Sequence, residues 1–324
     1  MGANKMSKEL LSVQHLKKHF KTDEGIVRAV DGIDFSVNVG ETFGLVGESG
    51  SGKSTTAYTI MGLYTPTEGK ITYKGTDISI GINKRPLPLK KDMQMVFQDP
   101  GSSLNPKRSI KQILELPLKA HDISKEDRQK RVIELLQMVE LPEDYLERYP
   151  TKMGGGEKQM IAIARALATN PSFIALDEPT SALDVSMQAK ILNMLLSFQK
   201  ELDLSYLFIT HNLSLMRNIA SRVGIMYLGK LFEVAPATEF FHKPLHPYTK
   251  MLLSSIPVIT DEEERMKPKK VVSRGEIPSP VNVPSGCYFH PRCIDCMDIC
   301  KKEEPPMIEV EQGHLVKCHL FSTS

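Results

Sequence analysis

A glycine-rich loop near the N-terminus carries residues that bind phosphate. Residues 47–54 read GESGSGKS, a complete G-x-x-x-x-G-K-[ST] pattern. In such a loop, successive backbone N–H groups point inward and form a nest for an anion. We expect Lys53 to reach the β- and γ-phosphates of a nucleotide and the Ser54 hydroxyl to bind Mg²⁺. The residues expected around the nucleotide are Gly47, Glu48, Ser49, Gly50, Ser51, Gly52, Lys53, Ser54 and Thr55.

Two adjacent carboxylates follow a second apolar segment. Residues 172–176 (SFIAL) predict a buried strand, and Asp177 and Glu178 come directly after it. Buried carboxylates are costly unless a cation or a polar partner compensates them. We expect Asp177 to hold Mg²⁺ through water and Glu178 to polarise the water that attacks the γ-phosphate. The competing interpretation is a strand end with solvated acids.

A histidine follows a third apolar segment. Residues 205–210 (SYLFIT) predict a strand, and His211 comes next. Ligands of open α/β sheets bind in the crevice outside the carboxyl ends of the strands. His211 is therefore a candidate catalytic residue, although a lone histidine at a strand end is more often structural.

Three glycines precede an amphipathic helix. Apolar residues recur at helical spacing after Gly156, yet glycine costs up to ~1 kcal/mol relative to alanine inside a helix. Bare backbone N–H groups at a helix N-terminus bind anions, and absent side chains let a phosphate approach closely. The alternative is a flexible loop.

The elements that must position these residues belong to an α/β fold, in which a strand at 42–46 leads into the glycine loop. The chain has 324 residues with 41 Lys+Arg and 39 Asp+Glu, and its net charge of +2 does not indicate a nucleic-acid partner. No basic n-region followed by an apolar h-region opens the sequence, so we expect no secretory signal. No apolar run approaches the ~18 residues that cross a bilayer. We expect a cytosolic chain that can bind to a membrane protein.

All five cysteines lie after residue 286. In a reducing compartment such a group is more often a metal site than a set of disulfides. Four thiolates can hold zinc or a [4Fe–4S] cluster, and their spacing does not decide between the two. The charged stretch at 260–270 has the composition of a linker before this region.

The motifs, in this order, resemble the ATP-binding cassette of ABC transporters over residues 9–258. The resemblance implies a P-loop α/β core with an antiparallel β subdomain and a helical subdomain at about 99–165. It implies that Gln98 in MQMVFQDP is the Q-loop glutamine near Mg²⁺, and that Asp184 in SALD belongs to the D-loop. Phe20 lies roughly where the family stacks an aromatic ring on adenine, although it could instead be an apolar strand residue.

Three segments resemble the peptide-importer branch of this family, in particular its F-type partner. They are FQDPGSSLNP (97–106), DEPTSALDVSMQAKILN (177–193) and HKPLHPYTKMLLSSIP (242–257). The resemblance implies an ATP-hydrolysing motor subunit at the cytoplasmic face of the membrane that drives di- or oligopeptide uptake. The implied partners are a homologous second ATPase in a heterodimer, two transmembrane permeases and an extracytoplasmic substrate-binding protein. Oligosaccharide or nickel import within the same branch is an alternative.

Two other functions compete with transport. One is a soluble ABC ATPase that acts on DNA or ribosomes, which the single P-loop and the near-zero net charge disfavour. The other is a metal-binding regulatory module with a residual nucleotide site, which Glu178 and His211 disfavour.

The C-terminal region resembles that of the same branch. The resemblance implies a linker at 259–275 and a Cys-rich domain at 276–324, with Cys287, Cys293, Cys300 and Cys318 as ligands of a [4Fe–4S] cluster. Cys296 is then an extra thiol. Zinc, or no metal, is the alternative, because His290, His314 and His319 lie nearby in the sequence.

The glycines at 154–156 correspond to the ABC signature, which is usually L-S-G-G-Q and meets the γ-phosphate held by a partner chain. Here the five residues are Met153, Gly154, Gly155, Gly156 and Glu157. Gly154 replaces the serine that donates a hydroxyl, and Glu157 puts a carboxylate near an anionic ligand. A hydrogen bond to a charged group contributes ~1.5–3 kcal/mol. We therefore expect two unequal ATP sites.

Overall fold

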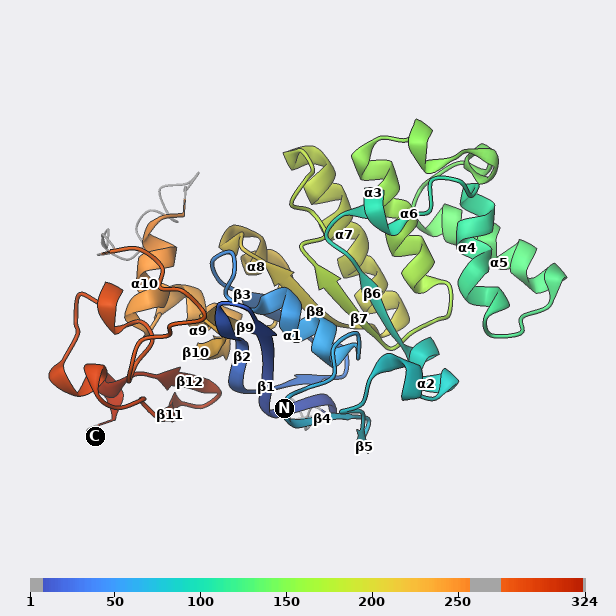
Figure 1. The fold of residues 1–324 in the computed structure, drawn as a ribbon. Coiled ribbons are helices and arrows are strands. Elements are labelled where there is room, and N and C mark those ends of the chain that lie inside the picture. Colours follow the sequence, from blue (N-terminus) through green and yellow to red (C-terminus); the bar gives the residue numbers. More distant parts are fainter. Residues whose placement is uncertain (1–7, 257–274, 323–324) are drawn as a thin grey trace, which may run out of the picture. The chain divides into compact units, whose positions relative to one another are not determined.

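The computed structural model describes residues 8–256 and 275–322, and Figure 1 labels their helices and strands. Two compact units are distinguished. Unit 1 contains Lys8, Asn38–Gly40 and Ile80–Ile209, and unit 2 contains Glu9–Val37, Glu41–Ser79 and the described residues from Thr210 onward. The predicted linker at 259–275 lies outside the described residues except for Gly275.

Parallel strands β8, β7 and β6 are neighbours in this order in unit 1. Their bounds are β6 (Met93–Val96), β7 (Phe173–Asp177) and β8 (Ser205–Thr210). The register places Phe173 of β7 opposite Met93 on one side and Ser205 on the other. Every residue of β7 and β8 is buried, as expected for parallel strands covered on both faces. The two apolar segments before Asp177 and His211 therefore form strands as predicted.

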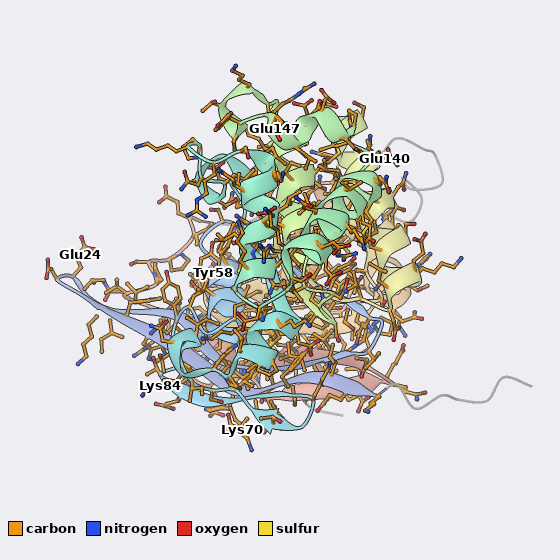
Figure 2. All side chains as sticks on the ribbon, turned by 90° about the vertical axis from the view of Figure 1, so that its right-hand side faces the viewer. Glu24, Tyr58, Lys70, Lys84, Glu140 and Glu147 are labelled. Carbon is orange, nitrogen blue, oxygen red and sulfur yellow. The ribbon has the colours of Figure 1, made fainter. Side chains whose placement is uncertain are left out.

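The described part of unit 1 also contains six α-helices. They are α2 (Leu87–Asp92), α3 (Pro100–Ser103), α4 (Ile110–Lys119), α5 (Lys125–Met138), α6 (Gly155–Leu167) and α7 (Val185–Leu202). Side-chain caps define several of their starts, and Ser109 and Ser124 accept backbone N–H groups at the beginnings of α4 and α5. Exposed Glu140 and Glu147 project outward from this helical part in Figure 2.

Unit 2 begins with an antiparallel sheet of order β2–β1–β4–β5. Its strands are β1 (Glu9–Thr22), β2 (Gly25–Asn38), β4 (Glu68–Tyr73) and β5 (Thr76–Asp77). A second set of strands has the order β11–β12–β10–β9–β3. These are β3 (Thr42–Val46), β9 (Arg222–Tyr227), β10 (Lys230–Pro236), β11 (Met307–Glu311) and β12 (His314–Lys317). Only β3 and β9 run parallel; the other pairs are antiparallel.

The C-terminal residues extend the sheet of unit 2, because β12 pairs with β10 with Val316 opposite Glu233. The helices of this unit are α1 (Lys53–Ile60), α8 (Leu213–Ile219), α9 (Ala237–His242) and α10 (Pro247–Ser254). Across residues 8–256 and 275–322, no helix combines the length and apolar character that crossing a membrane requires.

A buried histidine begins α10. His246 is 1% exposed, and its Nδ1 accepts the Tyr248 backbone N–H at 3.0 Å. Burial, with a smaller contribution from the charge of Lys250, lowers the pKa of His246 to about 3. The folded protein therefore keeps this imidazole neutral at pH values where the unfolded chain protonates it.

We expect His246 to make stability depend on pH. Its contribution is complete above the unfolded pKa of 6.5 and is lost as the pH falls toward about 3, because the unfolded chain then binds the extra proton. One pKa unit corresponds to ~1.4 kcal/mol, so the free energy of unfolding should drop by about 2 kcal/mol between pH 6.5 and 5. Asparagine keeps the cap acceptor and does not titrate. Urea unfolding of His246→Asn should therefore show a shallower pH dependence over this interval.

The exposed His242 of α9 supplies the control, and His242→Asn should retain the wild-type pH dependence. An unchanged slope in His246→Asn would contradict the assignment.

Candidate nucleotide-binding site

The glycine loop of unit 2 folds around the ammonium group of Lys53. It connects β3 to α1, and Lys53 is 5% exposed at the first residue of that helix. Its Nζ donates to the carbonyl oxygens of Gly47 and Glu48 at 2.8 and 2.9 Å, and to Ser51 Oγ at 3.4 Å. The loop thus holds one cation at the start of a helix, in the arrangement that phosphate binding needs.

Gly52 shows why the last glycine of the loop is required. It has φ +105°, and a Cβ there would lie 2.0 Å from the carbonyl oxygen of Ala29. No side chain caps α1, and its first turn contains no acidic residue. The backbone N–H groups of Lys53, Ser54 and Thr55 in this turn are therefore suited to binding an anion.

The predicted acids lie at the end of β7 in unit 1. Asp177 is fully buried at the last residue of the strand. Glu178 follows with φ +46°, a left-handed conformation that costs a non-glycine residue about 1–3 kcal/mol. Its backbone N–H donates to Ile209 of β8 at 2.9 Å, and its Oε2 accepts the side-chain amide of Gln98 at 3.2 Å. The neighbouring strand thus fixes the Glu178 backbone, and Gln98 orients its carboxylate.

A cavity of about 140 Å³ in unit 1 collects several of the predicted motifs. Residues from the Q-loop, the glycine-run helix, the end of β7 and the D-loop line it. They include Gln98, Asp99, Gly155, Lys158, Glu178 and Ser181. The tertiary structure therefore brings Gln98 and Glu178 to the N-terminal end of α6.

The glycine run begins α6 as predicted, with Gly154 as its N-cap. A Cβ on Gly154 would meet only Glu157 Oε2, at 3.7 Å, and Gly154 has φ −69°. Neither space nor backbone conformation therefore requires glycine at this position. A Cβ on Gly156, by contrast, would lie 2.7 Å from the side chain of Met187.

Glu157 has a role that the sequence analysis missed. Its Oε2 accepts the Gly154 backbone N–H at 2.8 Å, and its Oε1 accepts the hydroxyl of Tyr145. The Tyr145 hydroxyl, and secondarily the Gly154 N–H, lower the pKa of Glu157. A glutamate three residues after an N-cap is a sequence signature of helix capping, so the pattern itself carried this signal. No sequence signal pointed to Tyr145.

Asp184 of the D-loop is also a helix cap. Its carboxylate accepts the Met187 backbone N–H at 3.0 Å at the start of α7, and the Ser186 hydroxyl. The hydrogen bond from Ser186, followed by that from Met187, lowers the pKa of Asp184.

Two further predicted residues lie in unit 2. Phe20 is on β1, and its ring packs edge-on against Tyr64 with centroids 5.2 Å apart. Lys18 Nζ lies 4.8 Å from the centroid of the same ring. His211 directly follows β8 and is exposed.

The oxygen donors predicted for Mg²⁺ suit this ion chemically. Ser54 offers a hydroxyl, Asp177 a carboxylate and Gln98 an amide oxygen, and Mg²⁺ prefers such hard ligands. Ser54 is in unit 2, and the other two residues are in unit 1.

The iron–sulfur prediction is wrong. Within residues 8–256 and 275–322, no group of three or more His, Cys, Asp or Glu side chains is arranged to hold a metal ion, which also removes the zinc alternative. The five cysteines are free thiols. Burial raises the pKa of Cys287 and of Cys293 to about 12, and that of Cys318 to about 11. Cys318 instead packs with Leu245 and Val316 as a small apolar residue.

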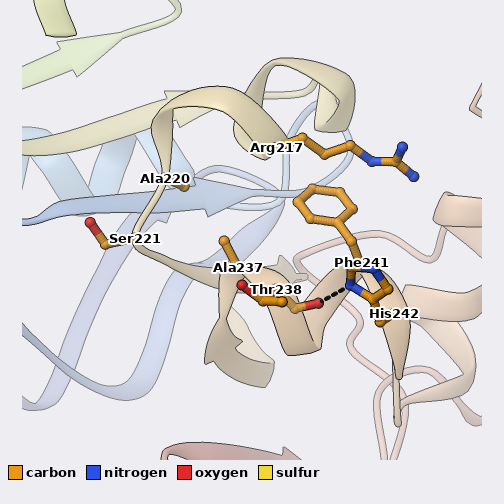
Figure 3. Close-up of a pocket in the computed structure, with 7 residues that line it drawn as sticks. All are labelled: Arg217, Ala220, Ser221, Ala237, Thr238, Phe241 and His242. Carbon is orange, nitrogen blue, oxygen red and sulfur yellow. Dashed lines mark hydrogen bonds between the residues drawn. The ribbon is translucent and has the colours of Figure 1, made fainter. Parts of the chain in front are cut away.

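A second cavity lies in unit 2, away from the predicted nucleotide residues. Its volume is about 400 Å³, and its lining includes Arg217 of α8 and Phe241 and His242 of α9 (Figure 3). The guanidinium of Arg217 lies 5.0 Å from the centroid of the Phe241 ring. None of the predicted site residues lines this cavity.

Comparisons with known proteins identify relatives of this chain. The ABC transporter family model matches residues 30–181, and the model of the oligopeptide/dipeptide transporter C-terminal region matches residues 232–300. The chain is 47% identical to the putative oligopeptide transport ATP-binding protein YkfD of Bacillus subtilis, covering 96% of this chain and 95% of the relative. It is 46% identical to the oligopeptide transport ATP-binding protein AppF of the same organism, covering 97% and 98%.

A solved structure shares the fold. It is a dimeric ATP-binding cassette in a post-hydrolysis state with bound ADP and Pi. It matches with a TM-score of 0.65 and 31% identity, covering 70% of this chain and 99% of that one. The chain therefore belongs to the ABC transporter family, among the oligopeptide transport ATP-binding proteins, and it is an ABC ATPase.

Proposed function

We propose that this ATPase is the motor subunit of an importer for di- and oligopeptides. The observation that carries the proposal is Glu178, held past the end of β7 in a left-handed conformation with Gln98 on its carboxylate. A carboxylate held in this way suits a general base that polarises the attacking water. The relatives named as oligopeptide transport ATP-binding proteins support peptides as the cargo.

The roles of the other residues follow from their chemistry. Lys53 binds the β- and γ-phosphates, and the N–H groups of the glycine loop surround them. Ser54, Asp177 and Gln98 would hold Mg²⁺, which neutralises phosphate charge when bound. Phe20 contacts the adenine, and His211 completes the catalytic set.

The chain works at the cytoplasmic face of the membrane with a homologous second ATPase, two permeases and an extracytoplasmic substrate-binding protein. We assign residues 9–258 to the ABC domain, with the helical subdomain at about 99–165, and residues 276–324 to the C-terminal domain. Helices α4 to α6 lie mainly within the bounds of the helical subdomain. The C-terminal family match at 232–300 supports the peptide branch.

The two ATP sites of the heterodimer are unequal. This chain's own P-loop is served by Glu178 and His211, whereas its signature serves the site of the partner. That signature lacks the serine hydroxyl at Gly154, and Glu157 already engages the Gly154 N–H at 2.8 Å. The γ-phosphate at the partner's P-loop therefore lacks the serine hydroxyl as a donor, and the Gly154 N–H is already used by Glu157.

We expect Glu178→Gln to abolish transport. Loss of a general base costs about 10²–10⁴-fold in rate, so ATP hydrolysis by the reconstituted transporter should fall at least 100-fold while ATP still binds. ATP-driven uptake of a radiolabelled dipeptide into proteoliposomes should stop with it.

Glu147→Gln is the matched control, because Glu147 is an exposed glutamate of the same unit, and it should leave both rates unchanged. Substantial hydrolysis by Glu178→Gln would place the working site on the partner's P-loop. Uptake of nickel or an oligosaccharide in place of peptide would refute the assignment of peptides as the cargo.

Restoring the family serine should strengthen the weaker site. Gly154→Ser introduces a hydroxyl donor worth ~1.5–3 kcal/mol toward a charged group, so nucleotide occupancy at the partner's P-loop should rise about tenfold or more at low ATP concentration. Trapped radiolabelled ATP per transporter measures this occupancy.

Gly154→Ala adds the Cβ without the hydroxyl and should behave as the wild type. Unchanged occupancy and turnover in Gly154→Ser would show that the two sites do not differ for this reason.

A further inference from the structure

Every polar group of Glu48, the second residue of the P-loop, is engaged within unit 2. Its carboxylate accepts two hydrogen bonds from the guanidinium of Arg292, at 2.7 and 3.1 Å. Its backbone N–H donates to the Tyr248 hydroxyl at 3.2 Å, and its carbonyl accepts Lys53 Nζ at 2.9 Å. The partners of Glu48 thus include two residues more than 190 positions away in the sequence.

Arg292 reaches the P-loop from the C-terminal region. It ends a short 3-10 turn (His290–Arg292) and is 7% exposed. Its guanidinium also lies 5.5 Å from the centroid of Tyr227 and 5.8 Å from that of Phe289. A buried arginine paired through two parallel hydrogen bonds fixes both direction and distance, which a single contact of a flexible lysine would not do.

An aromatic cluster holds Arg292 and Tyr248 in place. Phe289 packs against Tyr227 and Tyr248 with centroids 5.5 and 5.2 Å apart, and Tyr227 and Tyr248 are 4.9 Å apart. All three rings are nearly fully buried. Strand β9, helix α10 and the C-terminal region each contribute one ring, so this cluster joins all three to the neighbourhood of the P-loop.

We propose that Arg292 is a positioning residue for the ATP site, and that the C-terminal region acts through it to hold the P-loop in its phosphate-binding conformation. The P-loop contains three glycines, and glycine loses more conformational freedom on ordering than any other residue. The Arg292–Glu48 ion pair and the Tyr248 hydrogen bond order the loop before ATP arrives, so binding does not bear that cost. The inference depends on ATP binding by this P-loop.

The role of Arg292 predicts a loss of ATP affinity with turnover at saturation preserved. Arg292→Met keeps much of the side-chain length but removes the charge, and Glu48→Gln removes the carboxylate. Each should raise the Kd and KM for ATP about tenfold, equivalent to ~1.4 kcal/mol, and leave kcat within about twofold. Arg292→Lys, which keeps the charge but not the paired geometry, should give an intermediate Kd.

The measurement uses the intact transporter complex with the partner ATPase inactivated at its own P-loop lysine. A fluorescent ATP analogue reports equilibrium binding at this chain's P-loop, and hydrolysis in the unmodified complex gives kcat and KM. The double variant E48Q/R292M should lose no more affinity than either single variant, because both remove the same interaction. Lys243→Met is the control, since Lys243, which directly follows α9, forms an exposed ion pair with Glu311 of β11.

Lower thermal stability of Arg292→Met with an unchanged Kd and KM would reduce Arg292 to a structural residue and overturn the proposal. The proposal would also be overturned if the double variant lost ATP affinity by the product of the two single-variant factors. A wild-type complex that bound no ATP at this P-loop would refute the proposed function itself, and the wild-type binding curve shows this separately from any variant.

Discussion

The organisation of unit 2 follows from one buried ammonium group. Lys53 is 5% exposed, and a buried cation must be surrounded by acceptors. The loop supplies them by folding back over the start of α1, which requires left-handed backbone at Gly50 and Gly52. The close approach of Gly52 to Ala29 then ties the loop to β2, and the Gly229 N–H, in the turn between β9 and β10, donates to the Ser51 carbonyl at 2.9 Å. Because β9 lies beside β3, the same strand pairing that builds the sheet brings this turn to the loop.

Unit 1 uses acidic side chains for two different purposes. Asp99, Asp184 and Glu157 each accept backbone N–H groups at the start of a helix, where a negative charge also favours the helix dipole. Glu178 instead meets the Gln98 amide beside the same cavity, on a backbone that β8 holds in a costly conformation. Residue type alone does not separate the two uses. The conformation of the backbone and the identity of the hydrogen-bond donor do.

The C-terminal region is integrated with unit 2 by packing and polar contacts. Strand β12 pairs with β10, and fully buried Glu233 accepts the Leu245 and His246 backbone N–H groups while it contacts His314 Nε2 at 2.8 Å. Cys318 contributes apolar volume in this setting, and burial raises the pKa values of Cys287, Cys293 and Cys318. The grouping of the cysteines in the sequence suggested a metal site, and the family resemblance implied an iron–sulfur cluster. Proximity along the chain does not make a metal site, which needs several donors converging at one point.

The sequence by itself determined the local elements and the chemistry of the P-loop. Strand β3, the strands before Asp177 and His211, and the helix after the glycine run were all predictable, because apolar runs and helical periodicity reflect burial directly. The GESGSGKS pattern identified the phosphate loop, because its spacing is imposed by backbone geometry within eight consecutive residues. Only the tertiary structure decided what surrounds these elements. The Tyr145 hydroxyl on Glu157 and the Arg292–Glu48 pair depend on how separate segments pack, and no local pattern encodes which side chain from another segment will meet them.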